Sequence, residues 1–456
     1  MSARFKLKFL SANQDLTAEA PIKVGLATLG CKVNQYESAA LAEDLQKENF
    51  LLVPFNSVAD IYIINTCTVT SFSDFQARQL IHRAHRSNPQ AKILVTGCYA
   101  QIASATIAAI EGVSFVVGND RKNIITGLLK DKAAPSSRIL VADIFRQKEF
   151  CNIPLARFGD RTRTFLKIQD GCNSFCSYCI VPFARGKSRS LPPQEILSAL
   201  AKFDQEDYHE IVLTGIHLGV YGHDLDPATD LSHLLRQVFN LGLNSRLRLS
   251  SIEPREITTD LLNIFDNNDL LCPHLHIPLQ SGDDKILQLM KRNYDTLFYR
   301  KLIEIVCSTI SDMAIGIDVM AGFPSESDEQ FRNTVNLLEE LPVAYLHVFP
   351  YSERPGTSAQ NIGPKIPEAV KKERTTVLRN LSTRKREKFA LRFLGKPLKV
   401  LVEKTKDKKS GLLKGFSQNY LPFLLTGNIS SSANKIVTAR AEKYLDGNLY
   451  GKIISR

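Results

Sequence analysis

Short apolar segments rich in branched residues alternate with amphipathic stretches over residues 22–130. The segments VGLATL, IYIINT and KILVTG are typical of strands buried on both faces. Helix-like stretches such as ESAALAEDLQKENF and SDFQARQLIHRAHRS follow them. This alternation predicts an open parallel sheet wrapped by helices, in an α/β domain over residues 21–131. Residues 1–20 are polar and without pattern, so we expect a loose extension there.

A second and longer run of the same kind follows. Residues 132–157 contain APSS and a broken apolar pattern, which predicts a linker. Six strand-like segments then alternate with helical stretches over residues 158–390: FLKIQD, EIVLTG, RLRLSSI, HLHIPL, AIGIDVMAG and AYLHVFPYS. Six βα units predict an open or closed parallel barrel. The run ends in a long basic helix over about residues 366–391.

The tail over residues 391–456 loses helical periodicity. LKVLVEK, GLLKGFSQNYLPFLL, KIVTARAEKY and LYGKII are typical of short strands, and they predict a small β-barrel. The 456 residues suit about three domains.

Nine unevenly spaced cysteines favour metal-binding or reactive thiols in a reducing compartment over a disulfide scaffold. The first residues lack the apolar core of a secretory signal. No uncharged run reaches the length of a membrane span. We therefore expect a cytoplasmic protein with no membrane partner.

Positive charge is concentrated in one part of the chain. The formal net charge is +11, and residues 365–414 hold 17 Lys and Arg against 5 Asp and Glu, a net +12. Such a patch is the electrostatic footprint of nucleic-acid binding. A solvated helix face is the alternative, and the composition alone leaves both open.

One cysteine stands directly after each of the three strands expected in the first domain. These are Cys31, Cys67 and Cys98. Ligand sites of open α/β sheets lie outside the carboxyl ends of the strands, so the three thiols are expected to meet there. Gly30 and Gly97 precede two of them and permit sharp turns. A cysteine taken singly is more often a small buried side chain, whereas the repeated placement after strands leaves a shared metal site and simple packing equally open. Cys151, Cys272 and Cys307 lack this placement and are expected to be packing residues.

A second set, Cys172, Cys176 and Cys179, has the spacing C-x3-C-x2-C. A [4Fe–4S] cluster takes four ligands, so three thiolates would leave one iron with an open position. A zinc site would need a fourth ligand nearby, and His217 and His223 lie across a strand and a loop.

GCNSFCSYC resembles the signature of the radical S-adenosylmethionine enzymes. The resemblance implies that these three cysteines hold a [4Fe–4S] cluster with S-adenosylmethionine on the open iron. It also implies that an electron from the cluster cleaves S-adenosylmethionine to a 5′-deoxyadenosyl radical, which breaks an unactivated C–H bond.

Further segments, in order, resemble the methylthiotransferase family of these enzymes. GCKVNQYES, NTCTVT and VTGCYAQ resemble its amino-terminal domain, and LTGIHLGVYG, RLSSIEP, HLHIPLQSGDD and GIDVMAGFPSE resemble the loops of its partial (β/α)6 barrel. KGFSQNYLPFLL resembles its TRAM domain, a small RNA-binding β-barrel. This resemblance implies a second [4Fe–4S] cluster on Cys31, Cys67 and Cys98, which handles the inserted sulfur.

GCKVN resembles the group of the family that acts on threonylcarbamoyladenosine, at position 37 of tRNA next to the anticodon, and Lys32 is the discriminating residue. The isopentenyladenosine group is closer to GCQMN, and the group acting on a ribosomal protein is closer to GCPKN. The expected reaction replaces C–H by C–S–CH3 at carbon 2. One alternative is that the enzyme acts on isopentenyladenosine in tRNA. The other is that the chain is a non-catalytic, metal-containing RNA-binding protein. An electron donor and a sulfur source are implied but not identified.

Other site residues are expected at strand ends and in the tail. Tyr178 resembles the aromatic residue beside the adenosyl group, and Arg292 is expected to meet an acidic substrate or the carboxylate of S-adenosylmethionine. Further expected contacts are Thr214, Ser251, Glu253, Gln280 and Asp318 for S-adenosylmethionine, and Lys396, Lys399, Lys414 and Asn419 for RNA. The alternative is core packing for Tyr178, loop capping for Arg292 and the other strand-end residues, and a solvated surface for the tail residues.

Overall fold

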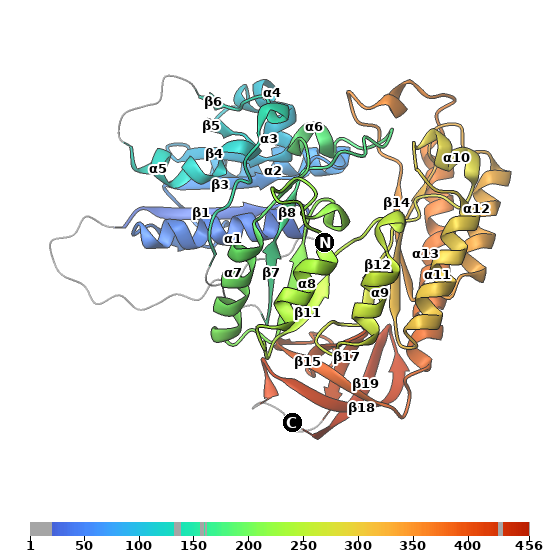
Figure 1. Ribbon diagram of the computed structural model, residues 1–456. Coiled ribbons are helices and arrows are strands. Elements are labelled where there is room, and N and C mark those ends of the chain that lie inside the picture. The colour runs from blue at the N-terminus through green and yellow to red at the C-terminus, as the bar shows by residue number, and fades with distance from the viewer. Residues whose placement is uncertain (1–20, 132–137, 156–158, 160–161, 427–431, 456) are drawn as a thin grey trace.

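The computed structural model describes residues 21–131, 138–155, 159, 162–426 and 432–455. Figure 1 shows a blue and cyan amino-terminal sheet beside a green-to-orange central barrel, with a red β-barrel beneath the latter. The extension expected over residues 1–20 lies outside the described residues. No helix of the described parts is both long and apolar enough to cross a membrane.

The amino-terminal region is a six-stranded parallel sheet. In sheet order its strands are β2 (Leu51–Val53), β1 (Lys23–Thr28), β3 (Ile61–Thr66), β4 (Lys92–Gly97), β5 (Val113–Val117) and β6 (Ile139–Leu140). The open parallel sheet expected from the alternating pattern is thereby confirmed. The short strands β2, β5 and β6 were not anticipated, and β6 comes from the segment expected to be a linker.

Helices cover both faces of this sheet because its central strands are apolar on both sides. α1 (Lys32–Lys47) and α5 (Ile125–Lys130) pack on one face, and α2 (Ser71–Ser87), α3 (Cys98–Ile102) and α4 (Ser104–Ala108) on the other. All six residues of β3 are buried. α1 also packs on the central barrel, because Tyr36, Ala39 and Ala40 belong to the barrel core.

The central region is a partial parallel barrel of six strands. These are β7 (Arg163–Lys167), β10 (Glu210–Thr214), β11 (Arg246–Leu249), β12 (His274–His276), β13 (Ala314–Ala321) and β14 (Tyr345–Pro350). Isolated bridges, Leu247 to Leu271 and Ser251 to His276, join its two three-stranded halves. No pairing joins β7 to β14 within the described residues. All six expected strands are present, and the barrel is the open form.

Helices line the outside of the barrel and bury one apolar face each. They are α7 (Pro193–Gln205), α8 (Leu231–Phe239), α9 (Thr259–Asp266), α10 (Asp284–Leu289), α11 (Thr296–Thr309), α12 (Asp328–Glu340) and α13 (Glu368–Leu391). Asp230, Thr258, Asp283, Asp295 and Ser327 cap five of these helices through side-chain oxygens. The expected basic helix is α13.

The tail forms a closed five-stranded barrel, as expected. Its order is β15 (Pro397–Lys406), β16 (Leu413–Ser417), β17 (Pro422–Thr426), β19 (Asn448–Ser455) and β18 (Ile436–Leu445). The segment GLLKGFSQNYLPFLL makes two of these strands rather than one, because the chain turns at Tyr420, where φ is +65°. This barrel packs at the amino ends of the central strands, which leaves their carboxyl ends for the cysteine loops (Figure 1).

Two cysteine sites and a cavity in the barrel

Cys31, Cys67 and Cys98 follow β1, β3 and β4, which are neighbours in the sheet. Gly30 has φ +100°, and a side chain there would lie 2.8 Å from the Cys67 Cβ atom. Burial raises the pKa of the Cys67 thiol to about 12, and the neighbouring Cys98 and Cys31 add to the rise. The structure therefore brings these three thiols to one edge of the sheet.

The first cysteine set is held against the loop that carries the second. α6 (Val181–Arg185) begins two residues after Cys179. The Asn119 side-chain amide donates to the Cys98 sulfur at 3.7 Å and to the Ala184 carbonyl at 2.8 Å. Arg185 donates to the Asn34 side-chain oxygen at 2.6 Å. The surroundings of the first cysteine set thus contact the short helix that follows the second set.

Cys172, Cys176 and Cys179 converge in the loop after β8 (Gln169–Asp170). His217 Nδ1 lies 3.3 Å from the Cys172 sulfur, and Arg292 donates to the Cys176 sulfur at 3.2 Å. Burial raises the pKa of the Cys179 thiol to about 12, and Cys176 and Cys172 raise it further.

Charged side chains lie directly behind this loop. His217 is bonded through Nε2 to Glu256, and Arg292 pairs with Glu253. Burial raises the pKa of Cys172, but the hydrogen bond and charge of His217 outweigh it and bring the pKa below the ordinary value. A lowered thiol pKa favours the thiolate, which is the form that binds metal.

Both donor sets suit iron–sulfur clusters, because each offers three converging thiols. The second set has one other possibility. With His217 it makes a Cys3His set, which also suits zinc. The sequence predicted that His217 lies too far away, across a strand and a loop, and this prediction is wrong, because the fold brings it beside Cys172.

A buried ion network joins the two cysteine-bearing regions. Glu37 of α1 pairs with Arg185 at 2.8 Å, with Lys167 at 3.1 Å and also with Lys122. Asp170 pairs with Arg185 at 3.0 Å. All five side chains are buried. Burial raises the pKa of Glu37, but Arg185, Lys122 and Lys167 bring it well below its usual range.

A cavity of about 330 Å³ lies inside the central barrel. It is lined by Lys32, Arg163, Phe165, Val212, Arg248, Ser251, His274, His276, Asp318, Tyr345, His347 and Tyr420. These residues come from α1, from the barrel strands and from the small barrel, so the cavity is walled by all three regions. A neighbouring groove of about 360 Å³ shares Tyr345, His347 and Tyr420 with it and opens between α13 and the small barrel.

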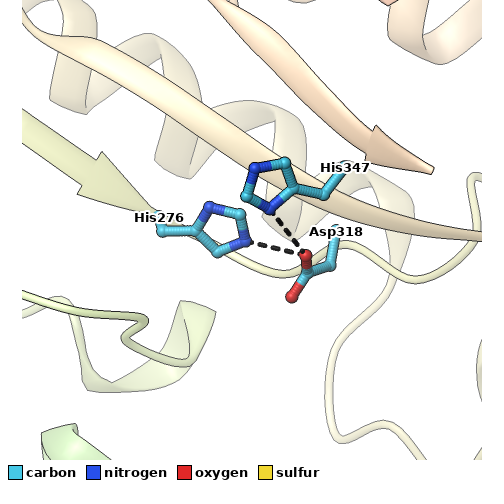
Figure 2. Close-up of side chains that lie close together, drawn as sticks. All are labelled: His276, Asp318 and His347. Carbon is cyan, nitrogen blue, oxygen red and sulfur yellow. Dashed lines mark ion pairs between the residues drawn. The ribbon is translucent and has the colours of Figure 1, made fainter. Parts of the chain in front are cut away.

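Three polar side chains from three strands meet in the cavity wall. Figure 2 shows His276 and His347 pointing at the same carboxylate, Asp318. The distances from Asp318 Oδ1 are 2.9 Å to His276 Nε2 and 3.5 Å to His347 Nδ1. These donors could ligate a divalent cation, and the same contacts also satisfy them without one.

The residues expected to contact S-adenosylmethionine fall into different surroundings. Ser251 and Asp318 line the cavity, whereas Glu253 pairs with Arg292 beside Cys176. Gln280 has φ +69° and a buried side-chain oxygen with no hydrogen-bond partner in the described residues. Thr214 is buried at the end of β10, and Tyr178 packs beside a small core cluster next to the second cysteine set.

The residues expected to contact RNA differ in their exposure to solvent. Lys396 and Lys399 are exposed, and Lys414 is half-buried. Asn419 is 1% exposed, and its side-chain oxygen accepts from the Ser417 hydroxyl at 2.6 Å, because the turn after β16 folds it inward. It lines the groove beside Arg386, Phe416 and Tyr420.

Sequence reasoning missed His276, His347 and Arg185. A signal existed for the two histidines, since HLH and LHV place a polar residue at an inward position of an otherwise apolar strand. No local signal marks Arg185, whose partners lie far away in the sequence.

Comparison with known proteins agrees with this arrangement. Residues 23–118 match a family described as "Uncharacterized protein family UPF0004", and residues 166–338 match the radical SAM superfamily. The radical S-adenosylmethionine methyltransferase TsrM from Kitasatospora setae has a similar fold, with a TM-score of 0.52 and 14% identity over 73% of this chain and 75% of that chain. The fold and the cysteine loop thus define a radical S-adenosylmethionine protein, a superfamily that implies a [4Fe–4S] cluster and S-adenosylmethionine.

Similar proteins of known function identify the family within the radical S-adenosylmethionine superfamily. The threonylcarbamoyladenosine tRNA methylthiotransferase MtaB of Aquifex aeolicus is 38% identical over 84% of this chain and 93% of its own length. That of Bacillus subtilis is 37% identical over 92% and 94%. The tRNA-2-methylthio-N(6)-dimethylallyladenosine synthase of Thermodesulfovibrio yellowstonii is 30% identical over 95% and 99%. This chain belongs to the MtaB family of threonylcarbamoyladenosine tRNA methylthiotransferases.

Proposed function

We propose that this protein methylthiolates carbon 2 of N6-threonylcarbamoyladenosine at position 37 of tRNA. The observation that carries the proposal is the pair of three-thiol sites, linked through Asn119, which donates to the Cys98 sulfur and to the Ala184 carbonyl of α6, in a chain of the MtaB family. A single open cluster would serve many radical reactions, whereas two adjoining sites suit sulfur insertion.

Cys172, Cys176 and Cys179 would hold one [4Fe–4S] cluster, and Cys31, Cys67 and Cys98 a second. When bound, the clusters and S-adenosylmethionine would relay the electron, generate the radical, handle the inserted sulfur and supply the methyl group of the reaction. His217 and Arg292 stabilise the thiolates of Cys172 and Cys176 through charge and hydrogen bonds. Glu256 and Glu253 hold these two cations in place.

The barrel wall orients the nucleoside and keeps water away from it. Phe165, Val212 and the aromatic rings of Tyr345 and Tyr420 give the cavity an apolar lining on which a base can stack. Asp318, fixed by two histidines, offers an oriented hydrogen-bond acceptor. Ser251 adds a hydroxyl.

The proposed path for the RNA runs over α13 and the small barrel. The groove beside the cavity is lined by Arg386, Phe416 and Tyr420, which combine charge with stacking surface. Exposed lysines such as Lys388, Lys396 and Lys399 suit phosphate contacts. A nucleotide bound in the groove could place its base in the cavity, since the two spaces share three residues.

Metal content tests the proposal against its non-catalytic rival. Anaerobically purified protein should contain about eight irons and matching sulfide per chain for two cubanes. Cys98→Ala and Cys172→Ala should each lower this to about four, whereas Cys307→Ala, outside both sites, should not. Zinc in place of iron would refute the enzyme reading and favour the Cys3His alternative.

Cleavage of S-adenosylmethionine separates the two sites. Cys172→Ala should abolish cleavage while tRNA binding persists. Cys98→Ala should retain cleavage but form no methylthio product. Cleavage that survives in Cys172→Ala would refute the assignment of the radical site.

Nucleoside analysis tests the substrate. In tRNA from cells lacking the protein, the methylthio group should disappear from threonylcarbamoyladenosine and from no other nucleoside. Loss from isopentenyladenosine instead would favour the dimethylallyladenosine group, to which the relatives at 30% identity belong.

A further inference from the structure

Lys32 lines the barrel cavity although its backbone belongs to the amino-terminal sheet region. It is the first residue of α1 and follows Cys31 directly. The other cavity walls come from barrel strands and from the small barrel at Tyr420. The Lys32 side chain therefore connects the first cysteine site with the place where a substrate base would lie.

The other charges in this cavity are already paired. Arg163 and Arg248 both lie against Glu210, and Arg248 donates to it at 2.9 and 3.0 Å. The carboxylate of Asp318 is paired with two histidines. Within the described residues Lys32 forms no hydrogen bond or ion pair with a side chain or carbonyl. A half-buried ammonium beside two arginines gains from an incoming anion.

We infer that Lys32 binds the carboxylate of the threonylcarbamoyl group and so selects this nucleoside over one with an apolar substituent. The inference rests on the proposed function and adds a specificity residue to it. The threonylcarbamoyl and dimethylallyl groups sit on the same adenine nitrogen, but only the former carries a negative charge. A cavity of about 330 Å³ has room for one modified base, as it lies at the small end of the range of ligand pockets.

A double-mutant cycle between protein and ligand tests this pairing. The ligands are anticodon stem-loop RNAs carrying threonylcarbamoyladenosine, its methyl ester, or isopentenyladenosine. The proteins are reconstituted wild type, Lys32→Gln, Lys32→Arg, and Lys92→Gln as a matched change at an exposed lysine of the same region. Dissociation constants are measured anaerobically, and iron content and circular dichroism verify each variant. If Lys32→Gln loses its fold, Lys32→Met replaces it.

We expect the RNA with the free threonylcarbamoyl carboxylate to bind about tenfold to a hundredfold more tightly than the RNA with its methyl ester, as for one charge-assisted hydrogen bond. This preference for the acid over the ester should hold for wild type, Lys32→Arg and Lys92→Gln. Lys32→Gln should bind the two about equally. An acid-over-ester preference that persists in Lys32→Gln would overturn the inference. The inference would also be overturned if wild type bound the acid and the ester equally but preferred both to the isopentenyladenosine RNA. That result would leave the proposed function intact. A wild-type preference for the isopentenyl RNA would instead overturn the proposed function.

Discussion

Glu210 organises the contact between the central barrel and the small barrel, and its neutralisation should loosen that contact. The carboxylate is fully buried at the start of β10. It accepts hydrogen bonds from Arg246 at 2.8 Å and from Arg248 at 2.9 and 3.0 Å, and Arg163 lies 3.7 Å away.

The same arginines reach across to the small barrel. Arg246 donates to the carbonyls of Lys399 and Phe416 at 3.2 and 3.0 Å, and Arg248 donates to that of Gln418 at 3.0 Å. Glu210→Gln would leave these buried guanidinium groups without a counter-charge. Removal of one partner from such an ion cluster costs about 3–5 kcal/mol. That is a large part of the stability of a typical domain, about 5–15 kcal/mol.

The assay is hydrogen exchange, read by mass spectrometry, together with urea unfolding. Protection of residues 397–417 should fall by about 150-fold to several thousandfold in Glu210→Gln, while β3 in the amino-terminal sheet keeps its protection. The control is Glu403→Gln, since Glu403 is half-buried and contacts Arg163 at 3.4 Å, so its loss should cost less than about 1 kcal/mol. Equal protection in wild type and Glu210→Gln would refute the role given to this carboxylate.

The pH dependence of this contact has a definite sign. Burial raises the pKa of Glu210, but Arg248 and Arg246 outweigh it and hold the pKa far below the ordinary 4.5. The stabilisation is therefore fully present above about pH 4.5 and is lost only as the pH falls through the lowered pKa. Wild type and Glu210→Gln should differ by a constant amount from pH 5 to 8 and converge in strong acid.

Three further outcomes are expected. Glu37→Gln leaves its buried cations poorly compensated and should cost about 3–5 kcal/mol, seen as a lower thermal midpoint and faster loss of iron; an unchanged midpoint would contradict this. Gly97→Ala should destabilise the first cysteine site, because φ is +97° and the new Cβ would lie 2.5 Å from the Thr66 nitrogen. In the control Gly127→Ala the new Cβ meets nothing within 4 Å in α5, so the protein should become slightly more stable. Thermal unfolding compares the two variants. Lys396→Glu combined with Lys399→Glu should weaken tRNA binding and flatten its salt dependence by about one unit of slope per lost phosphate contact; an unchanged slope would place the RNA elsewhere.

Local patterns in the chain were enough to predict most of the architecture. Apolar runs predicted the central strands of the first sheet, since burial on both faces requires continuous apolar residues. Apolar or alternating segments predicted all six strands of the partial barrel. The edge strands β2 and β6 escaped prediction, because a strand of two or three residues lacks a pattern of its own. The five-residue strand β5 was also missed. The turn that divides β16 from β17 escaped as well, since Tyr420 is not a usual residue for a positive φ.

The sequence by itself determined the grouping of Cys172, Cys176 and Cys179, because their close spacing makes them neighbours. For Cys31, Cys67 and Cys98 the sequence indicated only a placement after three strands, and the order of β1, β3 and β4 in the sheet brought the three together. Only the tertiary structure decided what surrounds the cysteines, such as His217 beside Cys172 and Arg185 between the sites. It also decided the contents of the barrel cavity, where His276, Asp318 and His347 meet and where the Lys32 side chain enters. Periodicity tells which side of an element a residue faces, but what lies opposite depends on how distant elements pack together.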